Sequence, residues 1–241
     1  MLVAISAQVS ASDEGDLETL KTDKKCIDCN FSQANLSYAT LIEANLKRSD
    51  LVGANLVGAN LTGANLAGTN LTGANLTEAN LTRANLTRAN LTGASLTRAN
   101  LTGANLTEAD LVGAYLMQGD LNWANLAGAN LTGANLTGTN LTGANLTKGK
   151  LFYANLSEGN LFYANLSEAN LTRANLVEAN LVGADLSDAN LTRANLEGAD
   201  LSDANLIRAN LVEANLEESS LTKTIFCETK LPDGTRDNSG C

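Results

Sequence analysis

Histidine is missing from this 241-residue chain, proline occurs once, and the aromatic residues together make up only 4% of it. Without histidine the chain cannot form a Ser-His-Asp or Cys-His catalytic arrangement, or a metal site with histidine ligands. The glycine-rich motifs that cradle nucleotide phosphates are also missing. We therefore expect a protein that is not an enzyme and that binds neither a cofactor nor a metal ion.

Long apolar runs and an excess of positive charge are also absent. No stretch approaches the length of about eighteen consecutive apolar residues at which a membrane-spanning helix is considered. The formal net charge of −10 favours solubility and disfavours contact with nucleic acid or an anionic membrane surface. We expect a monomer that has neither nucleic acid nor a membrane as its partner.

What the chain has in abundance is a repeat of five residues. From Leu36 to Leu221 every fifth residue is leucine, thirty-eight times without a miss. Two positions before each leucine stands a small residue, which is alanine in thirty-one of these pentads. The residue between them is asparagine in twenty-eight. The unit is therefore Ala-Asn-Leu followed by two variable residues, which we call x1 and x2.

A period of five fits neither the α-helix, with a period of about 3.6, nor the flat strand, with a period of about 2. If each pentad instead forms a short extended side followed by a turn, every Leu and Ala can point to one axis. Asn, x1 and x2 then stay outside, and successive coils stack about 4.8 Å apart through backbone hydrogen bonds. Glycine, which is frequent at x2, suits a turn with positive φ. The pattern predicts an all-β solenoid.

This pattern resembles the pentapeptide-repeat family over residues 29–228. The resemblance implies a right-handed quadrilateral β-helix, in which four pentads make one coil. The sequence itself does not set the number of sides, because its exact internal copies recur at spacings of ten and fifteen residues. Both ends of the chain also resemble those of exported cyanobacterial members of the family, including types found in the thylakoid lumen or the periplasm.

The segments outside the repeats differ from the repeats in composition. Residues 1–11 are apolar and end in the small-residue pattern of a signal-peptidase site, although no basic region precedes it. We expect residues 1–11 to be the remnant of a signal peptide, with a disordered tag as the alternative. Residues 12–28 are expected to form an N-terminal cap with a short helix over 12–20, in which Leu17 and Leu20 cover the first coil. The alternative is a frayed acidic tail.

All four cysteines lie near the ends of the chain, which fits export to an oxidising compartment. Cys26 and Cys29 form a C-x-x-C motif, which by itself suits zinc, a redox pair or a structural disulfide. Cys227 and Cys241 bracket a Pro-Asp-Gly turn, and residues 229–241 are expected to form a C-terminal cap segment. The resemblance to exported family members favours disulfides that pair Cys227 with Cys241 and Cys26 with Cys29. It also implies the periplasm or the thylakoid lumen as the location.

Clustered aromatic residues break the uniform surface and are candidates for binding a partner. These residues are Tyr115, Trp123, Phe152, Tyr153, Phe162 and Tyr163. In a coil of twenty residues, Trp123 and Tyr163 would share one side, and the two Phe-Tyr pairs would lie on opposite sides. The alternative is local repacking or a kinked rod, because glycine replaces the inward alanine at positions 119, 149 and 159.

Charge is also uneven along the chain. Residues 29–150 carry seven basic and six acidic side chains, whereas residues 151–228 carry four basic and twelve acidic ones. At a spacing of twenty, Glu158 would stack over Glu178, Glu197 over Glu217, and Glu168 over Asp188. Such rows of like charge repel one another and would attract cations or a basic partner. The alternative is a solvated acidic face.

We expect a non-enzymatic structural and interaction protein, a rigid rod that presents its surface to an unidentified protein partner. The resemblance also leaves a DNA-mimic function open, because some family members resemble the duplex and bind DNA gyrase. Here the acidity is confined to one half of the chain, and the C-terminus lacks an evident hydrophobic dimerisation segment. A third possibility is ice binding through rows of outward Thr, although Thr alternates with other residue types.

Overall fold

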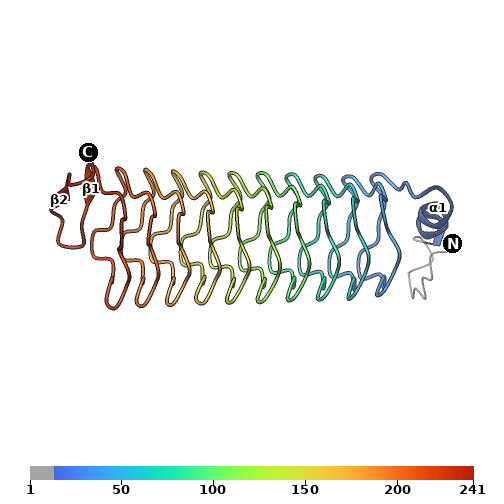
Figure 1. Cartoon of the computed structure of the whole chain (residues 1–241). Coiled ribbons are helices and arrows are strands. Elements are labelled where there is room, and N and C mark those ends of the chain that lie inside the picture. Colours follow the sequence, from blue (N-terminus) through green and yellow to red (C-terminus); the bar gives the residue numbers. More distant parts are fainter. Residues whose placement is uncertain (1–13) are drawn as a thin grey trace.

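The computed structural model describes residues 14–241; the expected signal-peptide remnant at 1–11 and the predicted helix start at 12–13 lie outside the described residues. Figure 1 shows a long rod of stacked coils. The helix α1 (Glu14–Asp23) lies at one end, and a hairpin of β1 (Thr229–Lys230) and β2 (Arg236–Asp237) lies at the other. The two strands of the hairpin are antiparallel.

Parallel backbone bridges join each pentad to the pentad twenty residues further on. One column of bridges begins with Lys25 and Asn45 and continues through ten bridges to Ile225. A coil therefore contains four pentads, a number that the sequence left open. With about 4.8 Å between coils, ten steps span about 48 Å. The predicted β-helical solenoid is confirmed. The column of backbone bridges begins at Lys25, which lies inside the segment 12–28 that was expected to form the N-terminal cap.

Within a pentad, four kinds of backbone hydrogen bond fix the chain, one of which joins the asparagine to the preceding coil, as when Asn55 N–H donates to the Ala34 carbonyl at 2.9 Å. Leu36 N–H and Tyr38 N–H donate to the carbonyls of Asn55 and Val57 in the next coil, at 2.7 and 2.8 Å. Ala39 N–H donates back to the Leu36 carbonyl at 3.1 Å and closes the turn. Because x1 and x2 lie in this turn, each pentad places them at a corner of the coil.

The asparagine of the repeat holds the turn that follows it. Asn60 Oδ1 accepts hydrogen bonds from the Thr62 backbone N–H at 3.2 Å and from the Thr62 hydroxyl at 2.6 Å. Asn commonly forms a turn of this kind, in which its side-chain oxygen accepts a hydrogen bond from the backbone two residues later. Some asparagines also bridge coils, as when Asn55 Nδ2 donates to Asn35 Oδ1 at 3.2 Å. The residue therefore serves both the corner and the stacking.

The x2 residue takes a left-handed backbone conformation whether or not it is glycine. Gly73 has φ +63°, and Arg83 has φ +56°. This conformation costs an L-residue about 1–2 kcal/mol, which glycine avoids. The hydrogen bonds on both sides of the turn hold the non-glycine residues there.

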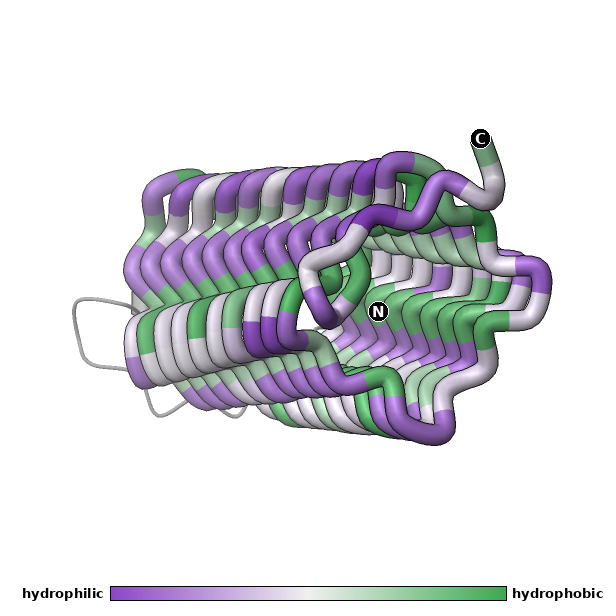
Figure 2. The backbone as a smooth tube through the Cα atoms, turned by 90° about the vertical axis from the view of Figure 1, so that its left-hand side faces the viewer, coloured by the Kyte–Doolittle hydropathy of each residue, from purple (hydrophilic) through white to green (hydrophobic). Residues whose placement is uncertain are grey.

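Leucine and alanine fill the axis of the rod. Leu101 and Ala104 are fully buried, as are nearly all their equivalents. Figure 2 shows that residues of similar hydropathy form rows along the rod. Thr69 and Thr139, which replace inward alanines, are also buried, and their hydroxyls donate to the carbonyls of Leu66 and Leu116. The core thus accepts a polar residue only with a partner for its hydroxyl.

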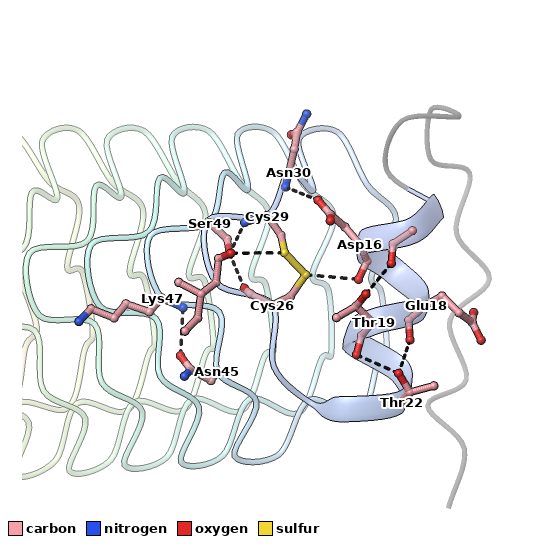
Figure 3. Close-up of a disulfide and its surroundings, with 12 residues drawn as sticks. Asp16, Glu18, Thr19, Thr22, Cys26, Cys29, Asn30, Asn45, Lys47 and Ser49 are labelled. Atoms are coloured by element: carbon pink, nitrogen blue, oxygen red, sulfur yellow. Dashed lines mark hydrogen bonds between the residues drawn. A yellow bond between two sulfur atoms is a disulfide. The ribbon is translucent and has the colours of Figure 1, made fainter.

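Helix α1 covers the first coil (Figure 3). Leu20 is buried in the core, and the Asp16 carboxylate accepts a hydrogen bond from Asn30 N–H at 2.9 Å. Lys24, in the left-handed conformation, ends the helix, and its carbonyl accepts from Asn45 N–H at 2.8 Å. The helix is therefore tied to the first coil by both packing and hydrogen bonds.

Disulfides lie at both ends of the rod. Cys26 is bonded to Cys29 beside α1, as Figure 3 shows, with the two Cα atoms 5.5 Å apart. Cys227 is bonded to Cys241, which returns the end of the chain to the last coil, with Cα atoms 4.9 Å apart. The C-terminal end is the less covered of the two, because Leu221 is 37% exposed there.

Candidate functional site

The structure divides the candidate aromatic residues between two corners that are half a coil apart. We call the column of x1 and x2 residues that contains Phe162 and Tyr163 the Trp123 corner, because Trp123 precedes Tyr163 by two coils. The column that contains Phe152 and Tyr153 is the Tyr153 corner. Ten residues separate the two Phe-Tyr pairs in a coil of twenty, so they face opposite sides of the rod.

On the Trp123 corner, the indole ring of Trp123 lies flat on Gly143 in the next coil. A Cβ atom added to Gly143 would be 2.4 Å from Cε3, 2.4 Å from Cζ3 and 2.7 Å from Cη2 of the indole. A point so close to three successive ring atoms must lie over the face of the ring. Trp123 is nonetheless 65% exposed, so its opposite face is open to solvent.

Tyr163 repeats this arrangement two coils further on. A Cβ atom added to Gly183 would lie 2.6 Å from Cε1 and 2.8 Å from Cδ1 of Tyr163, which is 61% exposed. Phe162 supports the ring from the side in an edge-to-face contact, with centroids 4.3 Å apart and an interplanar angle of 74°. The backbone places Gly143 between the two rings, because Trp123 N–H bonds to Thr142 and Gly143 N–H bonds to Phe162.

The Tyr153 corner combines aromatic and basic side chains. Phe152 and Tyr153 form an edge-to-face pair with centroids 4.2 Å apart. The Arg173 guanidinium lies 5.4 Å from the centre of the Tyr153 ring and donates a hydrogen bond to the Tyr153 hydroxyl. On the N-terminal side, five coils carry glycine at x2, from Gly53 to Gly133. The aromatic pair therefore lies at the end of a row of five x2 glycines, which we call the glycine strip.

Tyr115 belongs to neither corner, because it occupies the asparagine position of its pentad, where it is 50% exposed. Tyr38, which sequence reasoning missed, is 74% exposed and covers Gly58. The sequence signal that could have identified Tyr38 is an aromatic residue at x2 followed by glycine twenty residues later. The inward glycines do not interrupt the ladder, since Gly119 and Gly149 N–H groups bond to carbonyls as alanines do. The backbone passes these positions without a break.

Ion pairs between coils change the expected picture of the acidic rows. Glu168 and Asp188 do stack, but Glu168 pairs with Lys148 at 3.5 Å and Asp188 pairs with Arg208 at 2.6 Å. The Arg208 hydrogen bond keeps the pKa of Asp188 below its usual value of 3.8. These acids are therefore not an open cation site, which corrects the expectation for this pair. Among the described residues, Glu158 and Glu178 form no ion pair, and their row remains acidic.

Two shallow hollows in the described surface lie at x2 glycines between long side chains. One, of about 300 Å³, lies at Gly128 between Glu108 and Lys148. The other, of about 310 Å³, lies at Gly68 between Arg48 and Arg88. Both are open notches between corner side chains, and neither encloses a substrate-sized cleft lined by shifted acids and bases.

The remaining candidate metal ligands among the described residues lie at the N-terminal cap. Ligand atoms of Asp16, Cys26 and Cys29 lie within 4.8 Å of one another, but the two sulfur atoms are bonded to each other. A disulfide leaves no thiolate to bind a metal ion.

In the part of the chain that the structure describes, no helix has the length and apolar character needed to cross a membrane.

Comparison with known proteins agrees with this architecture. The family model for pentapeptide repeats matches residues 29–66, 54–93, 84–122, 120–157, 150–188 and 189–226. No curated protein matches the chain. The crystal structure of HetL, a pentapeptide repeat protein involved in heterocyst differentiation regulation from the cyanobacterium Nostoc, is 32% identical with a TM-score of 0.51. The match covers 92% of this chain and 97% of HetL.

Two other solved structures extend the comparison. A pentapeptide repeat protein from the Arabidopsis thaliana thylakoid lumen is 32% identical over 42% of this chain and 70% of its own, with a TM-score of 0.41. QnrB1, a plasmid-mediated fluoroquinolone resistance protein, is 20% identical over 73% of this chain and 89% of its own, with a TM-score of 0.44. With its repeats matched from residue 29 to residue 226, the chain belongs to the pentapeptide repeat family.

Proposed function

We propose that this protein is a non-enzymatic, monomeric interaction rod that holds a protein partner against its Tyr153 corner. The proposal includes a right-handed, four-sided β-helix as the frame. The observation that carries it is the cluster of Phe152, Tyr153 and Arg173 at the end of the glycine strip. The repeated Ala-Asn-Leu-Thr-Gly surface is nearly identical in each coil, so a specific partner must recognise a departure from the repeat such as this cluster.

The composition of this cluster favours a protein as the partner. Tyrosine and arginine are over-represented among the residues that contribute most to protein interfaces. Tyr153 is 50% exposed, and its contacts with Phe152 and Arg173 hold it in one place. A side chain that is already ordered loses less entropy on binding. The glycine strip lets the rest of a partner approach the rod closely.

The charge distribution favours this function over DNA mimicry. A DNA mimic needs rows of unpaired negative charge, whereas acids such as Asp28, Glu108 and Glu213 pair with arginines in adjacent coils. Ice binding is also less favoured, because threonine hydroxyls such as that of Thr62 donate to the Asn of their own pentad. HetL is involved in the regulation of heterocyst differentiation. This likeness supports the proposal of a regulatory rather than a catalytic role.

We further propose that the protein acts in an oxidising compartment, the periplasm or the thylakoid lumen. The support is the position of its disulfides, since Cys26–Cys29 and Cys227–Cys241 close the two ends of the rod. Structural disulfides persist in such compartments and are rare in the cytosol. There the two bonds would hold the terminal coils, which have a neighbouring coil on one side only.

Affinity capture from the periplasmic or lumenal fraction tests the function. The bait is the intact chain, compared with the double variant Tyr153→Thr with Arg173→Thr. The matched control is Tyr38→Thr, which removes a more exposed tyrosine from a different corner. We expect a partner that the control retains and the double variant loses while its melting temperature stays unchanged. Retention of every captured protein by the double variant would contradict the proposed site.

A further inference from the structure

The Trp123 corner has a regular pattern that protein binding at the Tyr153 corner does not explain. Its x2 residues alternate between a large residue and glycine over nine successive coils. In order they are Glu43, Gly63, Arg83, Gly103, Trp123, Gly143, Tyr163, Gly183 and Asp203. Large side chains therefore stand two coils apart on this corner, at a spacing of about 9.6 Å along the rod.

Two of these side chains form a platform of ring faces. Trp123 and Tyr163 each lie flat on the following glycine and keep their outer face open, at 65% and 61% exposure. Phe162 holds the Tyr163 ring by its edge-to-face contact. The two rings are therefore fixed in line along the rod axis before any ligand arrives. A ligand that fits must offer flat faces at the same spacing.

The platform carries no formal charge. None of the x1 and x2 residues on this corner from Asn122 to Gly183 has a charged side chain. Beside them runs the row of Asp120, Asn140, Asn160 and Asn180, in which Asn140 Nδ2 donates to Asp120 Oδ1 at 3.1 Å and Asn180 Nδ2 donates to Asn160 Oδ1 at 3.2 Å. Single-stranded nucleic acid also stacks on aromatic rings, but it needs a positively charged groove for its phosphates. A neutral ligand therefore fits this surface better.

A buried polar atom lies directly beside Trp123. The side-chain oxygen of Asn122 is buried and has no hydrogen-bond partner among the described residues. Most equivalent positions on this corner between residues 62 and 142 hold threonine, and the hydroxyls of Thr62, Thr82 and Thr142 donate to the asparagine two residues earlier. An unsatisfied buried polar group in a native protein calls for a reason, and such costs concentrate at functional sites.

From this geometry we infer that the Trp123 corner binds a linear, uncharged β-1,4-linked polysaccharide laid along the rod. The C–H groups on one face of a pyranose ring carry slight positive charge and pack against the negative face of an aromatic ring. In an extended β-1,4-linked chain successive sugars are turned over, so that every second sugar presents the same face. The repeat of two such sugars is close to two coil spacings, about 9.6 Å. Trp123 and Tyr163 thus receive alternate sugars.

The inference stands independently of the protein-binding proposal, because it concerns a different corner and a different ligand. Its test uses the hexasaccharides of β-1,4-linked glucose and β-1,4-linked N-acetylglucosamine, which distinguish cellulose-type from chitin-type chains. The hexasaccharide of α-1,4-linked glucose, which coils, is the control ligand. Trp123 is the only tryptophan of the chain, so its fluorescence reports on the site directly. Calorimetry provides a second measure of affinity.

The decisive variant moves one ring by a single coil. The double variant Gly103→Trp with Trp123→Gly keeps the composition and lets the new indole lie on a glycine, but it separates the rings by three coils. We expect it to bind as weakly as Trp123→Thr or Tyr163→Thr, each of which should lose about tenfold in affinity. Tyr38→Thr, which leaves the platform intact, should bind like the unaltered protein.

Four results would overturn the inference. The first is that neither β-1,4-linked hexasaccharide binds, and the second is that the α-linked control binds equally well. The third is that the ring-shifted variant keeps full affinity. The last is that Trp123→Thr loses a captured protein while no sugar binds, since this would assign the corner to a protein partner. Binding of either β-1,4-linked chain with loss on ring displacement supports it and identifies the sugar type.

Discussion

Trp123 lies flat on Gly143, the residue that takes its place one coil further along the rod. The glycine is needed for two separate reasons. Its φ of +62° disfavours any L-residue, and a Cβ atom there would be 2.4 Å from the indole ring. Gly73 has the same backbone conformation, with φ +63°, but no heavy atom lies within 4 Å of an added Cβ. The two glycines therefore separate backbone strain from the effect of the ring.

We expect Gly143→Ala to destabilise the protein more than Gly73→Ala. Both substitutions carry the cost of a left-handed alanine, about 1–2 kcal/mol. Only the first displaces the indole, so only the first should shift the emission of Trp123. Denaturant unfolding and fluorescence spectra of both variants check this. Equal losses of stability with unchanged emission would mean that the ring does not rest on Gly143.

Insertions test the twenty-residue register. One residue inserted after Leu101 shifts every later leucine out of its column, and we expect loss of cooperative melting in the C-terminal half. Duplication of residues 101–120 adds a whole coil and keeps every column, so the melting temperature should hold or rise. Circular dichroism and thermal melts distinguish the two. A tolerated single-residue insertion would be incompatible with the leucine columns.

Asn122 offers a substitution that should stabilise the protein. Asn122→Thr removes the buried oxygen without a partner and supplies a hydroxyl that can donate to Asp120, as Thr142 donates to Asn140. Relief of an unsatisfied buried polar group is worth about 1 kcal/mol or more. We expect a higher melting temperature. A lower melting temperature would show that the oxygen is satisfied in solution.

The disulfide Cys227–Cys241 should stabilise mainly the C-terminal coil. In the chain-entropy model, closing a loop of about fifteen residues contributes about 3 kcal/mol. The double variant Cys227→Ser with Cys241→Ser should therefore exchange amide hydrogens faster in residues 200–241 and leave the first coils unchanged. Mass spectrometry of non-reduced digests reads the pairing directly. Four free thiols in protein taken from an oxidising compartment would refute both predicted disulfides.

Acid should weaken the rod only at low pH. Hydrogen bonds from Arg48, Arg208 and Arg193 keep the pKa values of Asp28, Asp188 and Glu213 below their usual values. A carboxylate with a lowered pKa in the folded state stabilises that state at neutral pH. This contribution is lost as the pH falls through the lowered pKa. We expect steady melting temperatures from pH 7 to about 5 and a decline below about 4, and Asp188→Asn should reduce the decline. A decline between pH 7 and 5 would point to other groups.

The fold could be predicted from the sequence because one rule applies to every pentad. Leu101 and Ala104 are buried for the same reason as all their equivalents, so the five-residue period was enough to identify the core. The number of pentads in a coil was not accessible in this way, since each side of the coil has the same composition. The register of backbone bridges decides it, and this is a long-range property.

The surface was predictable only in part. Once a coil has twenty residues, the alignment of Trp123, Gly143 and Tyr163 follows. Tyr38 was missed because its pairing with Gly58 can be recognised only once the coil is known to contain twenty residues. The pairing of Lys148 with Glu168 was also missed, because stacked acids were considered without the bases on either side of them. Such choices depend on side-chain length and neighbours rather than on the period.

The half-coil separation of the two Phe-Tyr pairs has a consequence for how such a rod acquires new surfaces. The segment Leu-Phe-Tyr-Ala-Asn-Leu-Ser-Glu occurs at 151 and again at 161, ten residues later in a coil of twenty. A gene duplication of two pentads therefore rotates a motif by half a turn, whereas a duplication of four would extend it along the same corner. The length of the copied segment decides between a second, independent face and a longer version of the first. A duplication of two pentads can therefore give the rod a second binding face, whereas a duplication of four pentads gives it a longer one.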